Sequence, residues 1–106
     1  MDRIKDLDAI VQHEVADYNN AVAWKAKGYY LADKDNGIYT VIDVPDVDHP
    51  TARQPIIVVM ARIVDDKVII DEDTTDRPLY EELMRNGIPR EQIILAYAGE
   101  TLPETT

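Results

Sequence analysis

The chain has 106 residues, 45% of them hydrophobic and 30% charged, and its 21 acidic and 11 basic residues give a formal net charge of −10. This length fits one domain, residues 1–106, with a modest core. The lack of cysteine and serine excludes disulfides, thiolate metal sites and serine or cysteine nucleophiles, and the acidic balance opposes binding to a phosphate backbone. The sequence has no apolar run near the roughly 20 residues of a membrane span and no signal-peptide core, so we expect a cytoplasmic protein.

Met1–Tyr18 is predicted to form an amphipathic helix. Its apolar residues recur at helical spacing and form one stripe: Ile4, Leu7, Ile10, Val11, Val15 and Tyr18. The helix is expected to end at Asn19-Asn20, because both residues favour turns. The next segment, Ala21–Ala26, is ambiguous between a short helix and a loop. Its Trp24 is interpreted as a residue that closes the core, with an interface anchor as the alternative.

Two strands, Tyr29–Asp33 and Ile38–Val44, are predicted on either side of Asp35-Asn36-Gly37. Asn-Gly indicates a hairpin turn because both residues tolerate positive φ. The segment Pro45–Pro55, rich in proline and acidic residues, is predicted to be a loop or an edge crossing.

A second hairpin is predicted from Ile56–Val64 and Lys67–Asp71, with Asp65-Asp66 as its two-residue turn. Val64 then lies opposite Lys67. One face of this hairpin is wholly apolar and is expected to face the core: Val59, Ala61, Ile63, Val68 and Ile70. The other face is mixed, with Ile56, Val58, Met60 and Ile69 bordered by Arg62, Lys67 and Asp71. A slip of one residue would exchange the two faces, so the pattern defines the register.

A short helix with the apolar stripe Leu79–Met84 is predicted next, with Asp76 as N-cap and Pro78 in the first turn. Gly87 is expected to end this helix in a Schellman motif. Ile93–Tyr97 is then expected to be a buried strand. The predicted fold class is α+β: a mainly antiparallel sheet of about five strands, with an N-terminal helix and a helix before the last strand.

The second half of the chain resembles the XisI-like family. The matching features are a strand pair ending in D-x-K-V-x-I, a helix with E-E-L, the stop N-G-I-P-R-E-Q-I and a final apolar strand. The residues that carry the resemblance are Asp65, Lys67, Val68, Ile70, Glu81, Glu82, Leu83, Gly87, Pro89, Ile93 and Leu95. Proteins of that family are known as controlling factors for excision of the fdxN element. The resemblance implies a XisI-like fold and, as partner, a XisH-like protein with a nuclease-like fold.

Carboxylates offer two places for metal chemistry. Asp43, Asp46, Asp48 and His49 fall across a proline-interrupted loop, which is more typical of a solvated acidic loop than of a cation site. Asp71, Glu72 and Asp73 end a strand, where alternation would point the first and third one way and the second the other, so a polar strand exit is favoured. His13 is interpreted as a boundary residue of the first helix. A small metal-dependent hydrolase or nuclease built on these carboxylates is the alternative function.

The favoured hypothesis is a non-enzymatic regulatory protein that binds another protein and forms a homodimer. The mixed hairpin face is too apolar to be left in water, and an acidic chain suits a basic partner. The candidate interaction residues are Ile56, Val58, Met60, Arg62, Ile69, Asp46, Asp48, Asp71 and Asp73, with Asp43 as a further acid that steers the encounter. We expect no cofactor, no metal, no membrane association and no direct binding to nucleic acid.

Overall fold

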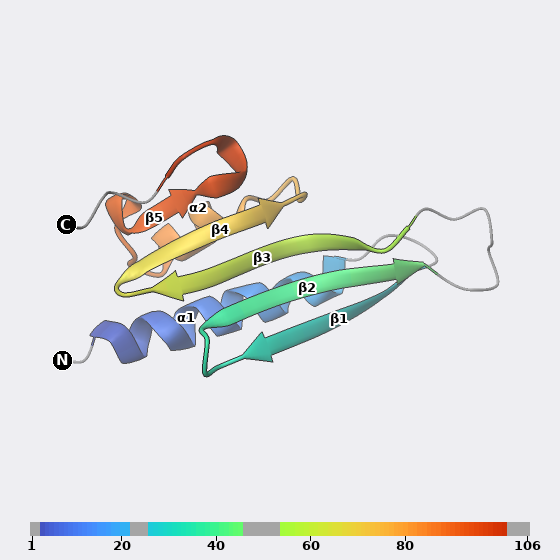
Figure 1. The fold of residues 1–106 in the computed structure, drawn as a ribbon, viewed down its shortest axis with the longest axis horizontal. Coiled ribbons are helices and arrows are strands. Elements are labelled where there is room, and N and C mark those ends of the chain that lie inside the picture. Colours follow the sequence, from blue (N-terminus) through green and yellow to red (C-terminus); the bar gives the residue numbers. More distant parts are fainter. Residues whose placement is uncertain (1–2, 22–25, 46–53, 102–106) are drawn as a thin grey trace.

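The computed structural model describes residues 3–21, 26–45 and 54–101. Its elements in chain order are α1 (Arg3–Asp17), the 3-10 helix η1 (Tyr18–Ala21), β1 (Ala26–Asp33), β2 (Ile38–Pro45), β3 (Ile56–Val64), β4 (Lys67–Asp73), α2 (Leu79–Arg85), η2 (Arg90–Gln92), β5 (Ile93–Leu95) and η3 (Ala96–Ala98). The strands form one sheet in the order β1-β2-β3-β4-β5, antiparallel except for the parallel pair β4 and β5. Both α-helices lie behind the sheet in Figure 1. The predicted fold class is confirmed.

The core lies between the two α-helices and the sheet. Four residues of the predicted stripe belong to it, Leu7, Val11 and Val15 of α1 and Tyr18 of η1, each 5% exposed or less. Full burial of an apolar side chain contributes about 1.5–3 kcal/mol, so this stripe is the main reason that α1 stays on the sheet. Trp24 and the side chain of Ile4 lie outside the described residues. Among the helices of the described segments, none combines the length and apolar character that crossing a membrane requires.

The two hairpin turns rely on local polar contacts and on left-handed backbone. The Asp33 carboxylate accepts hydrogen bonds from the backbone N–H and the side-chain amide of Asn36, at 3.3 and 2.8 Å. Of the Asn36-Gly37 pair, only Gly37 has positive φ, at 67°. A Cβ at Gly37 would also lie 3.3 Å from the carbonyl oxygen of Ile63, whose N–H donates to Gly37. In the second turn Asp65 has φ of 56°, which aspartate tolerates better than most residues.

The start of α2 differs from the prediction. The carboxylate of Asp73 accepts the N–H of Leu79 at 2.8 Å, and it also accepts the N–H and hydroxyl of Thr75 at 2.9 and 2.6 Å. Pro78, not Asp76, occupies the N-cap position, and it makes no side-chain cap bond. The prediction that Asp76 caps this helix is therefore wrong. Asp73, six residues before Leu79, accepts the N–H of that residue instead, because the loop between them folds back to bring the carboxylate to the start of the helix.

The end of α2 is the predicted Schellman motif. Gly87 has φ of 97°, the N–H of Ile88 donates to the carbonyl of Leu83 at 3.1 Å, and the N–H of Gly87 donates to that of Met84 at 3.0 Å. Ile88 is 5% exposed and belongs to the core cluster. The glycine thus ends the helix and turns the chain back into the core.

The last strand is shorter than predicted, Ile93–Leu95 rather than Ile93–Tyr97. Side chains occupy its outer edge: Arg90 donates to the carbonyl of Ile93 at 2.7 Å, and Glu100 accepts the N–H of Leu95 at 2.9 Å. Arg90 and Glu100 also form an ion pair at 2.7 Å. Because these groups take the place of a neighbouring strand, β5 is a closed edge.

Candidate interaction surface

The sheet has an outer face, opposite the helices. Tyr39 and Val41 of β2 and Ala61 of β3 are buried in the core, so the residues between them point the other way. With their partners in the strand register, the apolar residues of this outer face include Tyr29, Leu31, Ile38, Ile42, Val44, Ile57 and Met60. None of the helices in the described segments lies over β1, β2 and β3 on this side (Figure 1).

A β-bulge in β3 determines which residues the outer face contains. Val41 lies opposite Val59, whereas the next residue of β2, Ile42, lies opposite Ile57. Val58 is therefore an extra residue, and it turns into the core with 5% exposure. A bulge reverses the alternation of faces on one side of it, so the simple odd–even pattern stops at this point.

The bulge corrects the predicted patch. Ile56, Val58 and Met60 were expected on one open face, but only Met60 lies on the outer face. Val58 is a core residue, and Ile56 lies opposite Asp43, which is on the helix side of the sheet. Ile57, 40% exposed, takes the place that was predicted for Val58.

Ile69 also differs from the prediction of an open patch. It faces away from the core cluster, yet it is only 2% exposed. In the register its neighbours are Arg62 on β3 and Ile94 on β5, and η3 also contacts β4. Within the part of the chain that the structure describes, the outer face is therefore closed over β4 and open over β1, β2 and β3.

A second bulge, in β4, places the carboxylates at the strand end. Ala61 lies opposite Ile70 and Met60 opposite Glu72, so Asp71 is the extra residue. Asp71 and Glu72 thus reach the outer face together, which reverses the predicted alternation. Asp71 accepts a forked pair of bonds from Arg62, at 2.7 and 3.3 Å, and this contact holds the pKa of Arg62 above its ordinary value. This ion pair borders the apolar surface as predicted.

The remaining predicted acids that the structure describes are not arranged as a metal site. Asp73 has both oxygens engaged in the loop before α2, and Asp43 is 2% exposed. Asp46, Asp48 and His49 lie outside the described residues. Within residues 3–21, 26–45 and 54–101, no three acidic or histidine side chains are grouped to hold a metal ion.

The exposed acids of the described sheet lie at its hairpin turns. Asp33 and Asp35 stand at the β1–β2 turn, and Asp65 and Asp66 stand at the β3–β4 turn. Both turns lie at the same end of the sheet (Figure 1), because β2 and β3 are neighbours. These exposed carboxylates lie at the end of the open apolar face, and the prediction from the sequence did not include them among the interaction residues.

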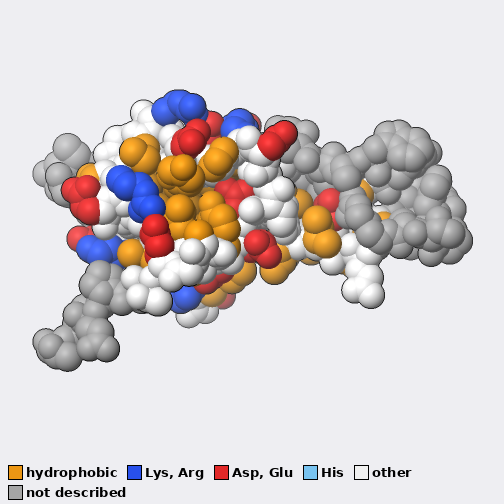
Figure 2. Space-filling view, turned by 90° about the horizontal axis from the view of Figure 1, so that it is seen from above, with side chains coloured by type: hydrophobic (Ala, Val, Ile, Leu, Met, Phe, Trp, Pro, Cys, Tyr) orange, Lys and Arg blue, Asp and Glu red, His pale blue; other side chains and the backbone are white. Residues whose placement is uncertain are grey.

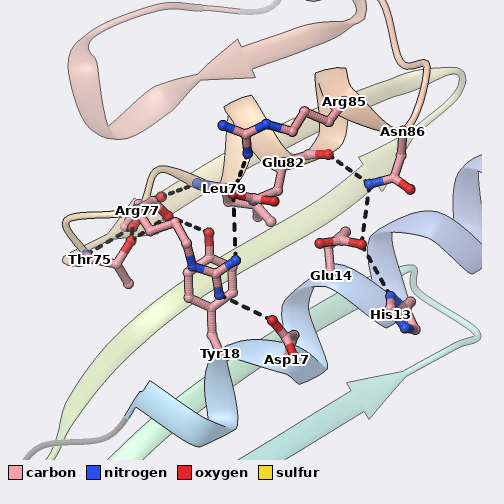
Figure 3. Close-up of polar contacts among 11 residues, drawn as sticks. His13, Glu14, Asp17, Tyr18, Thr75, Arg77, Leu79, Glu82, Arg85 and Asn86 are labelled. Atoms are coloured by element: carbon pink, nitrogen blue, oxygen red, sulfur yellow. Dashed lines mark hydrogen bonds and ion pairs between the residues drawn. The ribbon is translucent and has the colours of Figure 1, made fainter.

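A polar network joins α1 to α2 (Figure 3). At its centre, the Arg77 guanidinium lies 3.2 Å from Asp17 and 3.5 Å from Glu82, and it covers the ring of Tyr18 at 4.4 Å. The Tyr18 hydroxyl donates to the backbone carbonyl of Arg77, and burial raises the pKa of this tyrosine above its ordinary value. Every group in the network has an internal partner, so its role is to hold the two helices together.

His13 and a hollow near α1 offer no catalytic arrangement. His13 lies on the exposed side of α1, with its Nδ1 3.1 Å from the Glu14 carboxylate and its side chain 82% exposed. A hollow of about 190 Å³ lies between α1 and the segment Asn86–Gln92, and none of the described residues that line it has a titratable side chain. Its two amides, Asn86 and Gln92, already donate to neighbouring oxygens.

The comparisons with known proteins agree with this fold. The family model described as XisI protein matches residues 1–106. A solved XisI-like protein from Anabaena variabilis is 24% identical, with a TM-score of 0.75 over 89% of this chain and 85% of that one. The solved fdxN element excision controlling factor XisI from the same organism is 21% identical, with a TM-score of 0.75 over 91% of this chain and 93% of that one. At these identities the likeness establishes the fold. None of the curated proteins matches the chain.

Proposed function

We propose that the chain, which belongs to the XisI family, is a regulatory protein without catalytic activity that binds a XisH-like protein of nuclease-like fold. Its setting is the excision of a DNA element or a related system. That setting is suggested by its likeness in fold to the fdxN element excision controlling factor XisI of Anabaena variabilis. The outer face of the sheet is the contact surface.

The observation that carries the proposal is the apolar composition of a sheet face over which no described segment lies at β1, β2 and β3. Leu31, Tyr29 and Ile57 are 51%, 42% and 40% exposed, and they adjoin the half-buried Ile42 and Met60 in the strand register. Contiguous apolar surface of this kind is typical of a protein-binding site. Aromatic and methionine side chains are also enriched where partners meet.

The negative charge of the chain favours a basic partner. The chain carries a net charge of −10, and the exposed acids at the two hairpin turns border the outer face. Such charges accelerate the encounter with a basic surface, while the apolar side chains slow dissociation. A nuclease-like partner needs a basic surface to hold DNA. The acidic chain competes with DNA for that surface, and this competition is the regulatory mechanism.

The test is binding of the purified XisH-like protein from the same genome to single variants of the chain. Ile57→Asp places a charge on the outer face, and Met84→Asp makes the same kind of change at a similarly exposed residue of α2, 43% against 40%. We expect Ile57→Asp to weaken binding about 30-fold, the equivalent of a ~2 kcal/mol hot spot, and Met84→Asp to bind as the wild type does.

Circular dichroism of each variant checks that it is folded. The assignment of the outer face would be contradicted if both variants lost binding equally, or if neither variant lost binding. If the chain binds no XisH-like protein but cleaves nucleic acid in the presence of a divalent metal, the metal-dependent enzyme replaces this proposal.

A further inference from the structure

The two edges of the sheet are built differently. Figure 2 looks down on the side where β5 lies, and it shows charged side chains of both signs around a group of apolar ones. There the Arg90–Glu100 pair occupies the hydrogen-bonding groups of Ile93 and Leu95. At the other edge, β1 is eight residues long, and among the described residues β2 is its only strand neighbour. An open strand of this length is a template for another strand.

We infer that two copies of the chain pair through β1, antiparallel and around a two-fold axis at Tyr30, to form one continuous sheet. This dimer goes beyond the proposed function, because it needs no other protein. In it, Lys27 lies opposite the partner's Asp33, and Tyr29 lies opposite the partner's Leu31. Gly28 lies opposite the partner's Ala32.

The pattern of faces limits the possible registers. Two antiparallel strands related by a two-fold axis through one sheet keep the same face on the same side, so residues of the outer face must meet each other. Lys27, Tyr29, Leu31 and Asp33 share that face, since Tyr29 and Leu31 lie opposite Ile42 and Thr40. The register between the two β1 strands can therefore change only in steps of two residues.

Charge complementarity selects one of these registers. With Tyr30 on the axis, both strand ends form opposite-charge pairs, and the centre forms an aromatic–aliphatic pair on each side of the axis. A shift of two residues in one direction puts Lys27 opposite Leu31. A shift in the other direction puts Tyr29 opposite Asp33. Lys27 already projects along this face, since its Nζ lies 5.5 Å from the ring centroid of Tyr29.

The dimer joins the two outer faces into one apolar surface. Tyr29 and Leu31, 42% and 51% exposed in one copy, lie at the seam. The pairing also gives the outward backbone groups of β1 the hydrogen-bond partners of a second strand. The competing interpretation is that Lys27 protects a lone edge strand from pairing, as charged side chains often do.

Charge reversal distinguishes the two interpretations. In Lys27→Glu the dimer would place Glu opposite Asp33, and in Asp33→Lys it would place two lysines together. Each variant alone is expected to weaken the dimer at least about tenfold, because the two-fold axis repeats every changed pair. A mixture of the two variants forms a heterodimer in which both pairs are again of opposite charge. Asp35→Lys, at an exposed residue outside the strand, is the matched control.

Sedimentation velocity measures the outcome. The salt concentration is about 0.15 M, at which charges further apart than about 8 Å are screened, so the effect comes from the close charge pairs. The expected result is a wild type with twice the 12.0 kDa mass of the chain, the same for Asp35→Lys, two monomeric single variants and a dimer in their mixture. A monomeric wild type would overturn the inference and leave Lys27 as an edge guard. Single variants that stay dimeric, or a mixture that stays monomeric, would overturn the register.

Discussion

Replacing Asp73 by alanine is expected to destabilise the domain by about 2–3 kcal/mol, although Asp73 lies outside the helix that it supports. Its carboxylate accepts three hydrogen bonds, from the N–H of Leu79 and from the N–H and hydroxyl of Thr75. Leu79 is wholly buried, so its N–H finds no water when the carboxylate is removed. A buried donor without an acceptor costs about 1–3 kcal/mol, and loss of a helix cap costs typically ~1 kcal/mol.

Urea unfolding followed by circular dichroism measures this effect. Asp73→Asn retains one oxygen and is expected to lose about half as much stability as Asp73→Ala. Asp76→Ala is the control, because Asp76 is exposed and lies in the same loop; its expected change is within about 0.5 kcal/mol. If Asp76→Ala destabilises the protein as much as Asp73→Ala, the capping account is wrong and the prediction from the sequence was right.

Three further predictions concern single groups and the charge of the whole chain. Gly87→Val should lower the free energy of unfolding by roughly 1–2 kcal/mol, because a side chain is strained at φ of 97°; an unchanged urea midpoint would show that the helix does not end there. The N–H of Leu95 and then Arg90 hold the pKa of Glu100 below its ordinary value of 4.5, so its stabilising contribution is complete above that pH and is lost as pH falls through the lower folded value. The stability difference between wild type and Glu100→Gln should therefore shrink below pH 4.5, and a difference that does not depend on pH would contradict the edge contact. At about 0.15 M salt the pure protein should not shift a DNA duplex in a gel at micromolar concentration, and a sequence-selective shift would make it a direct DNA reader.

Patterns within short segments predicted much of this fold. The Asp65-Asp66 turn defined the register of the second hairpin, with Val64 opposite Lys67 as observed. Gly87 followed by Ile88 predicted the end of α2 because a Schellman motif depends on a few consecutive residues. The stripe of α1 predicted its buried side for the same reason.

The two bulges could not be predicted from the sequence, because each lies in a run of residues of a single type. Residues 56–60 are all apolar and residues 71–73 are all acidic, so alternation of residue type carries no information about which residue is extra. The first bulge is stabilised from a distant segment: the N–H and hydroxyl of Thr74 donate to the carbonyl of Val58 at 2.9 and 3.0 Å. Only the folded chain brings these groups together. Met60 and Arg62 therefore lie on the face on which the sequence predicted them, whereas Val58 and Ile56 do not.

Contacts between separated residues explain the other differences. Asp73 reaches the start of α2 across a loop, and Glu100 reaches back to the edge of β5. The part that β1 and β2 play in the outer face also depends on strand pairing, so Tyr29 and Ile42 were missed as surface residues. The alternation of these residues with buried neighbours indicated that they face away from the core. The strand order, which the sequence did not show, places them together on one face.

The central claim is that the acidic chain occupies the basic surface of a XisH-like protein through its outer face. The most direct measurement is the fluorescence anisotropy of a labelled DNA duplex bound to that protein, titrated with the wild-type chain and with Ile57→Asp. We expect the wild type to displace the DNA, and about 30-fold more of the Ile57→Asp variant to be needed for the same displacement. If the anisotropy stays unchanged while the wild-type chain binds, the two ligands occupy different surfaces and the claim is contradicted.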